Sequence, residues 1–133
     1  MDRLDCFNLA AAQILQRLLE SFPEPMFMDA TLLTDEVAKV YPECNFGRGP
    51  GNSGTLVAWT MRFLIDEGYV RISGRGDGAA FAGSLLTSKA LAALNQPLES
   101  LEPRKTIGRR IIEVGKQMAP EVATTLIGRL MGA

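Results

Sequence analysis

The chain contains no histidine among its 133 residues. Histidine is the commonest general base near neutral pH. Its absence therefore excludes catalytic arrangements that pair serine or cysteine with histidine, and it excludes histidine-containing zinc sites. Catalysis by carboxylate or lysine side chains remains possible, but no pair of these residues has a spacing typical of an active site. We predict no catalytic residue, no metal and no cofactor, and a protein that is not an enzyme.

Cysteine is also scarce, with Cys6 and Cys44 as the only two. They do not form a CxxC spacing, and a four-cysteine zinc site cannot be built from two residues. Small, isolated cysteines of this kind are typical of buried, reduced thiols. We therefore expect two unpaired thiols in the core.

Long apolar runs are missing as well. No stretch reaches the roughly 18 to 20 apolar residues that a membrane-spanning helix needs. The N-terminal segment has Asp2 and Asp5 on either side of Arg3, rather than the charge-free apolar core of a secretory signal. These features predict a cytoplasmic protein.

The composition is that of a soluble globular protein, with 47% hydrophobic and 22% charged residues. The length is enough for one domain with a real core. Charge is unevenly distributed: residues 1–46 carry eight acidic and three basic side chains, whereas residues 104–133 carry two acidic and six basic. Such a chain can pair its own ends, or those of a partner.

Three helices are expected in the first half of the chain. Apolar residues recur at helical spacing over 8–22, where Asn8 is the predicted N-cap and Pro23 ends the helix. Residues 26–30 form one short extended segment. A second helix is expected to start at Thr34 and to end before Pro42.

The third helix is expected over residues 53–69. Ser53 is its predicted cap, and Gly68 is placed to end it in a left-handed turn. The helix is apolar around most of its circumference, so most of it should be buried. Trp59 is accordingly expected in the core.

A glycine-tipped hairpin is predicted next. The segment "YVRIS" alternates in polarity and is rich in β-forming residues, "GRGDG" is a turn, and "AAFAGSLLT" returns as a second strand. Thr87 or Ser88 then caps a fourth helix, "KALAALN".

This order of elements resembles the winged helix-turn-helix family. The resemblance is most specific at "FLIDEGYVR", the end of the third helix and the entry to the wing, and at "SLLTSKALAAL", the exit from the wing. It covers about residues 7–95. It implies an α+β fold, mainly α, with a two-stranded wing. We expect a winged-helix domain over 1–96, a linker over 97–105, and a C-terminal amphipathic helix over 106–133.

The resemblance also implies where nucleic acid would bind. In that family the third helix commonly enters the major groove and the wing touches the DNA backbone or minor groove. The matching residues of the third helix are Asn52, Ser53, Thr55, Thr60 and Arg62, and those of the wing are Arg71, Arg75 and Lys89. Arg48, with the helix N-terminus behind it, adds a phosphate contact.

Two functions follow, and the sequence leaves both open. The first, which we favour, is a small bacterial-type transcriptional regulator that binds double-stranded DNA and forms a homodimer through its ends. Against it, residues 1–103 are net acidic, and DNA affinity depends strongly on neutralised phosphates. The second is an interaction or adaptor module on the same fold, which docks a partner protein or a membrane through its basic C-terminal helix, since fold alone does not fix function.

The C-terminal segment is predicted to be an amphipathic helix, kinked or broken at Pro120. Its glycines lower helix propensity by about 1 kcal/mol each, so it needs a surface to form on. Three surfaces are considered: a second copy in a homodimer, the acidic first half of the same chain, or an anionic membrane. The predicted partner-binding residues are Ile107, Arg109, Arg110, Ile111, Val114, Met118, Val122, Leu126 and Leu130.

Overall fold

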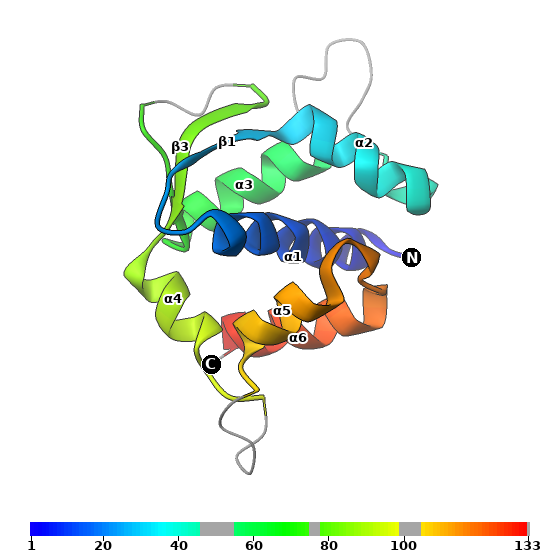
Figure 1. Cartoon of the computed structure of the whole chain (residues 1–133). Helices are drawn as coiled ribbons and strands as arrows, with labels where there is room; N and C mark the ends of the chain where they lie inside the picture. The colour runs from blue at the N-terminus through cyan, green and yellow to red at the C-terminus, as the bar shows by residue number, and fades with distance from the viewer. Residues whose placement is uncertain (46–54, 75–77, 99–104, 133) are drawn as a thin grey trace.

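The computed structural model describes residues 1–45, 55–74, 78–98 and 105–132. It is an α+β fold, mainly helical, as predicted (Figure 1). Along the chain the elements are α1 (Arg3–Ser21), β1 (Met26–Asp29), α2 (Ala30–Val40), η1 (Pro42–Cys44), α3 (Leu56–Asp66), β2 (Val70–Arg71), β3 (Ala80–Leu86), α4 (Ser88–Leu94), α5 (Ile107–Val114), η2 (Gly115–Gln117) and α6 (Pro120–Gly132).

The strands form an antiparallel sheet in the order β1-β3-β2. The predicted hairpin is confirmed, since Val70 pairs with Leu86 and Arg71 with Leu85. The predicted extended segment is β1, and it pairs with the other side of β3, where Met28 faces Phe81. The sheet therefore has one strand more than the two-stranded wing that was expected, and the layout is compatible with a winged helix.

Helix α1 forms the centre of the molecule. Figure 1 shows it between α2, α3 and the sheet on one side and α5 and α6 on the other. Burial on both sides explains its composition, because the consecutive small residues Ala10, Ala11 and Ala12 are all buried together with Ile14 and Leu15. Small side chains let neighbouring helices approach closely, and the larger ones fill the space between them.

Two predicted helix starts are wrong, and an aspartate is the reason in each case. Helix α1 begins five residues before Asn8, in a capping box where the Asp2 carboxylate accepts from the Asp5 N–H and Asp5 accepts from the Asp2 N–H. Asn8 lies buried inside the helix, and its side-chain amide donates to the Thr124 hydroxyl. Helix α2 is capped by Asp29, not by Thr34.

Thr34 instead joins α2 to the start of α3. Its buried hydroxyl donates to the Ala30 carbonyl at 2.7 Å and accepts from the Val57 N–H at 3.1 Å. The Val57 N–H lies in the first turn of α3 and has no partner within its own helix. Thr55 caps α3, and the predicted cap Ser53 lies outside the described residues.

The C-terminal segment packs on α1 of the same chain and shares its core. Five of the predicted partner-binding residues are buried there: Ile107, Ile111, Met118, Leu126 and Leu130. Their face is therefore covered by α1 and is not free for a dimer or a membrane, which corrects the prediction for these residues. Val114 and Val122 are half-buried, and Arg109 and Arg110 are exposed.

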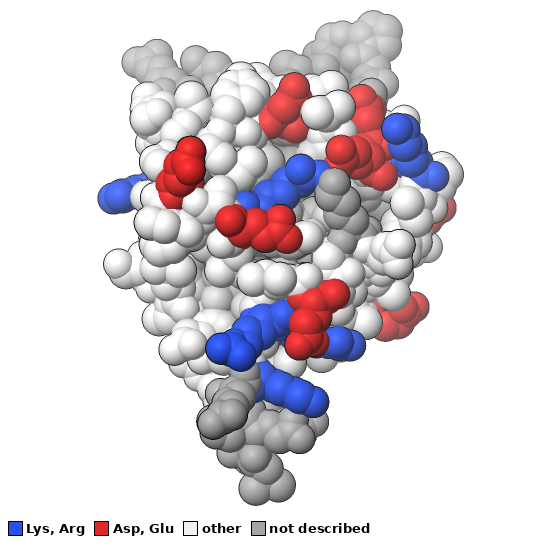
Figure 2. Space-filling view, in the orientation of Figure 1, with Lys and Arg blue, Asp and Glu red and all other residues white. Residues whose placement is uncertain are grey.

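Residues 1–96 and 106–132 accordingly contribute to one hydrophobic core rather than to separate units. The predicted break in the last helix is present, but it starts at Gly115, whose φ is +62°, and Pro120 occupies the first turn of α6. On the face drawn in Figure 2, acidic and basic side chains are interspersed rather than gathered into a field of one sign.

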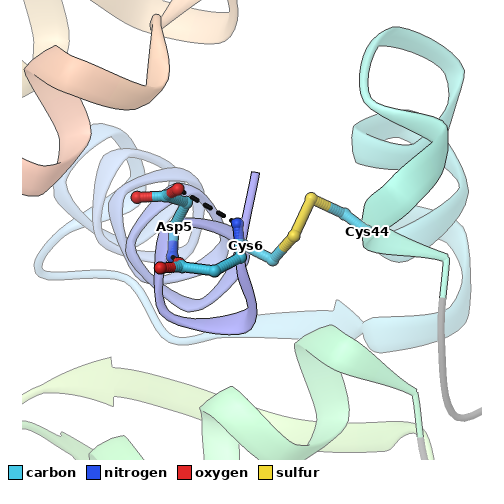
Figure 3. The surroundings of a disulfide bond; sticks show 4 residues. Asp5, Cys6 and Cys44 are labelled. Carbon is cyan, nitrogen blue, oxygen red and sulfur yellow. Dashed lines mark hydrogen bonds between the residues drawn. A yellow bond between two sulfur atoms is a disulfide. The ribbon is translucent and has the colours of Figure 1, made fainter.

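The two cysteines form a disulfide, so the expectation of reduced thiols is wrong. Cys6 of α1 is bonded to Cys44 of η1, with the Cα atoms 5.4 Å apart (Figure 3). Burial was predicted correctly, because both residues are almost fully covered. The bond ties the start of α1 to the chain that leaves α2.

Within the described ranges, no helix is both long enough and apolar enough to cross a membrane.

Candidate interaction surface on α1, α3 and the wing

Helix α3 has one buried face, and its opposite face is unusually apolar for a face that is exposed to solvent. Leu56, Val57, Met61 and Leu64 point into the core. The opposite side carries Trp59 and Phe63, one helical turn apart, which are 39% and 43% exposed. The prediction that Trp59 is a core residue is therefore wrong.

Helix α1 extends this exposed surface. The ring of Phe7 meets the ring of Phe63 edge-on, with 5.3 Å between the centroids. Leu4, three residues before Phe7 and on the same side of α1, is 65% exposed. Leu4, Phe7, Trp59 and Phe63 are hereafter called the aromatic surface. Large apolar side chains that are exposed together mark contact sites more often than single ones do.

The rim of the aromatic surface is acidic. Asp66 and Glu67 follow Phe63 at the end of α3, and both are exposed. Asp2, the N-cap of α1, and Asp5, in its first turn, flank Leu4 in the sequence. Negative side chains at these positions disfavour phosphate groups and favour a partner with basic residues.

Hydrogen bonds hold the end of α3 to the β2–β3 hairpin, which is hereafter called the wing. Gly68 has the positive φ of +84° that was predicted, and the Tyr69 N–H donates to the Leu64 carbonyl at 2.8 Å. The Thr87 hydroxyl donates to the Gly68 carbonyl and also accepts from the Ala90 N–H, which confirms Thr87 as the cap of α4. The wing is thus fixed relative to α3.

Two cations that were predicted to contact nucleic acid donate hydrogen bonds to backbone carbonyls of the chain instead. The Arg62 guanidinium donates to the Gly78 carbonyl at 2.6 Å, across the entry to β3. The Lys89 ammonium donates to the Glu67 carbonyl at 2.6 Å and lies 4.5 Å from the centre of the Tyr69 ring. Both contacts would compete with a phosphate for the same donors.

The other residues predicted to contact nucleic acid do not form one exposed surface in the described part of the chain. Thr60 is buried and its hydroxyl donates to the Leu56 carbonyl, so its assignment to a groove-facing position is wrong. The Thr55 hydroxyl accepts from the Ala58 N–H. Arg71 is exposed on β2, where it lines a groove between α3 and the wing together with Arg62. The others, Arg48, Asn52, Ser53 and Arg75, lie outside the described residues.

The aromatic surface was not predicted from the sequence. A signal for it was present in the third helix, which has more apolar residues than one buried face can hold, including the adjacent trio Phe63, Leu64 and Ile65. Only Leu64 of these is fully buried. The contribution of Leu4 and Phe7 had no local signal, because it depends on how α1 packs against α3.

Comparison of the chain with protein-family models, with curated proteins and with solved structures found no match. In the described part of the chain, no three Cys, Asp or Glu side chains come together in a way that would hold a metal ion.

Proposed function

We propose that this protein is a winged-helix interaction module that binds another protein through the aromatic surface. The observation that carries the proposal is the joint exposure of Trp59 and Phe63 on the outward face of α3. In a winged helix this is the face that would be presented to a partner. Aromatic side chains dominate the energetics of protein–protein contacts, because they bury a large area at a small cost in side-chain entropy.

The chemistry of the partner follows from the surface and its rim. An apolar centre bordered by Asp66 and Glu67 on α3, and by Asp2 and Asp5 on α1, complements an apolar protein segment flanked by lysine or arginine. A second copy of this chain is one such protein, because Arg109 lies exposed three residues before Ile112, which is itself 45% exposed. A homodimer is thus one form of the proposal.

DNA binding by a transcriptional regulator is the second candidate function. One observation favours it: the groove between α3 and the wing is lined by the basic residues Arg62 and Arg71. The first of these already donates to the Gly78 carbonyl, and Asp66 lines the same groove. We therefore rank protein binding above DNA binding.

The location and the absence of catalysis remain proposals as well. We propose that the protein is not an enzyme, on the sequence argument that it has no histidine. The cytoplasmic location proposed from the sequence must accommodate the Cys6–Cys44 disulfide, since such bonds persist mainly in oxidising compartments. A measured compartment would decide between the two arguments.

Site-specific photo-crosslinking tests the proposed function. A photoreactive phenylalanine analogue placed at Phe63 in the full chain should, in the producing cells, give a covalent adduct with one protein of defined mass. The same analogue at Leu32 of α2, which is also well exposed, should not give that adduct. An adduct of twice the chain mass identifies the partner as a second copy.

Substitution of a rim residue sharpens the test. Asp66→Lys should reduce the Phe63 adduct several-fold, because an attractive charge across the rim becomes repulsive. Identical adduct patterns from Phe63 and Leu32, or no adduct from either, would contradict the proposal.

A further inference from the structure

A pocket of about 250 Å³ lies between α1, α2 and the connection that leads into α6. Its inner walls are Leu9 of α1, Leu33 and Val37 of α2, and Met118 of the connection, all of which are buried. The buried amide of Gln13, which donates to the Gly115 carbonyl, is the polar part of this wall. An apolar protein cavity of about 150 Å³ is large enough to bind benzene. The space here is therefore sufficient for a small ring or a short acyl chain.

The mouth of the pocket is polar, and its charge is unbalanced. Val40, which is 64% exposed, stands at the opening beside Glu36, Lys39 and Tyr41. The Glu36 carboxylate forms an ion pair with the Arg17 guanidinium, so its negative charge is compensated. Lys39 has no ion pair within the described ranges, and it leaves a net positive charge at the opening.

We infer that this pocket binds a small amphiphilic carboxylate. Its apolar body would contact Leu9, Leu33 and Met118, and its carboxylate would lie at the opening, near the Lys39 ammonium and the Tyr41 hydroxyl. Apolar walls with a few polar groups that fix the orientation of the ligand are the usual composition of small-molecule sites. This site is separate from the aromatic surface, and the inference does not depend on the proposed function.

Because of the position of the pocket, a bound ligand would stabilise the contacts between several elements of the core. Leu33 and Val37 belong to α2, which contacts α3 through Thr34, whereas Met118 belongs to the C-terminal segment. A bound molecule would touch α1, α2 and the C-terminal segment at once. It would therefore stabilise the folded chain, by an amount that grows with the logarithm of the free ligand concentration above the Kd.

Calorimetric titration of the full chain with sodium octanoate tests the inference. Octanoate should bind saturably, with a Kd on the order of 1 mM, as expected for about ten non-hydrogen atoms. Lys39→Gln should raise that Kd about two- to fivefold, the usual range for an exposed ion pair. Arg71→Gln, an exposed cation remote from the pocket, should leave it unchanged. Lys39→Gln should have no effect on 1-octanol, which has no charge.

A pocket-filling variant gives the second readout. Val37→Trp should abolish binding of both octanoate and octanol while the circular dichroism spectrum stays that of a folded protein. If the tryptophan variant does not fold, Val37→Phe takes its place with the same expectation. Absence of saturable octanoate binding up to about 10 mM, roughly ten times the expected Kd, would overturn the inference. Equal weakening by Lys39→Gln and Arg71→Gln would also overturn it.

Discussion

Replacing Ile111 by alanine should lower the free energy of unfolding by about 2–5 kcal/mol. Ile111 belongs to the buried face of α5, which packs on α1, and its side chain is 0% exposed. Truncating it leaves a cavity in the one core that the segment shares with the rest of the chain. Because small domains are stable by only about 5–15 kcal/mol, urea or thermal unfolding will show a loss of this size clearly.

The neighbouring residue provides the matched control. Ile112 is the same residue type in the same helix but is 45% exposed. Ile112→Ala should change the unfolding free energy by no more than about 0.5 kcal/mol. If Ile111→Ala is as harmless as Ile112→Ala, the C-terminal segment is not docked on α1. Its apolar face must then be covered by a partner or a membrane.

Loss of the disulfide should have an effect of similar size. The bond between Cys6 and Cys44 closes a loop with a sequence separation of 38. A crosslink of that span removes chain entropy from the unfolded state worth about 4 kcal/mol. Urea unfolding of the oxidised protein, with and without a reductant, should show this difference.

The variant Cys6→Ser, Cys44→Ser serves as the control, because its stability should be low from the start and should not respond to reductant. Thiol titration of the purified protein under denaturing conditions, without reductant, should detect no free thiol. Two free thiols per chain, with no stability change on adding reductant, would contradict the disulfide.

Features with a local cause were predictable from the sequence. The hairpin of β2 and β3 is specified by its alternating polarity and by its glycine-rich turn. Gly68 has the positive φ that was predicted for the end of α3, and Thr87 caps α4 as predicted. The helix starts at Asn8 and Thr34 were predicted wrongly, because Asp2 and Asp29, six and five residues earlier, cap the two helices instead. Capping residues compete, and composition alone does not rank them.

Features with a tertiary cause were not predictable. The apolar periodicity of the C-terminal segment is the same whether it covers α1, a second copy or a lipid surface, so only the fold shows that α1 is its neighbour. The pairing of Cys6 with Cys44 depends on where η1 lies relative to α1. The exposure of Trp59 depends on which face of α3 the sheet and α1 leave uncovered. No local pattern contains this information.

The central claim is that the outward face of α3 is used for protein contact rather than for DNA. Titration of the full chain into a random-sequence duplex at about 50 mM salt, with a repeat at about 200 mM, tests it most directly. We predict no binding tighter than about 100 µM at the lower salt, because most described cations near α3 are engaged and the rim is acidic. Binding near 1 µM that weakens about a thousandfold at the higher salt would show phosphate contacts and contradict the claim.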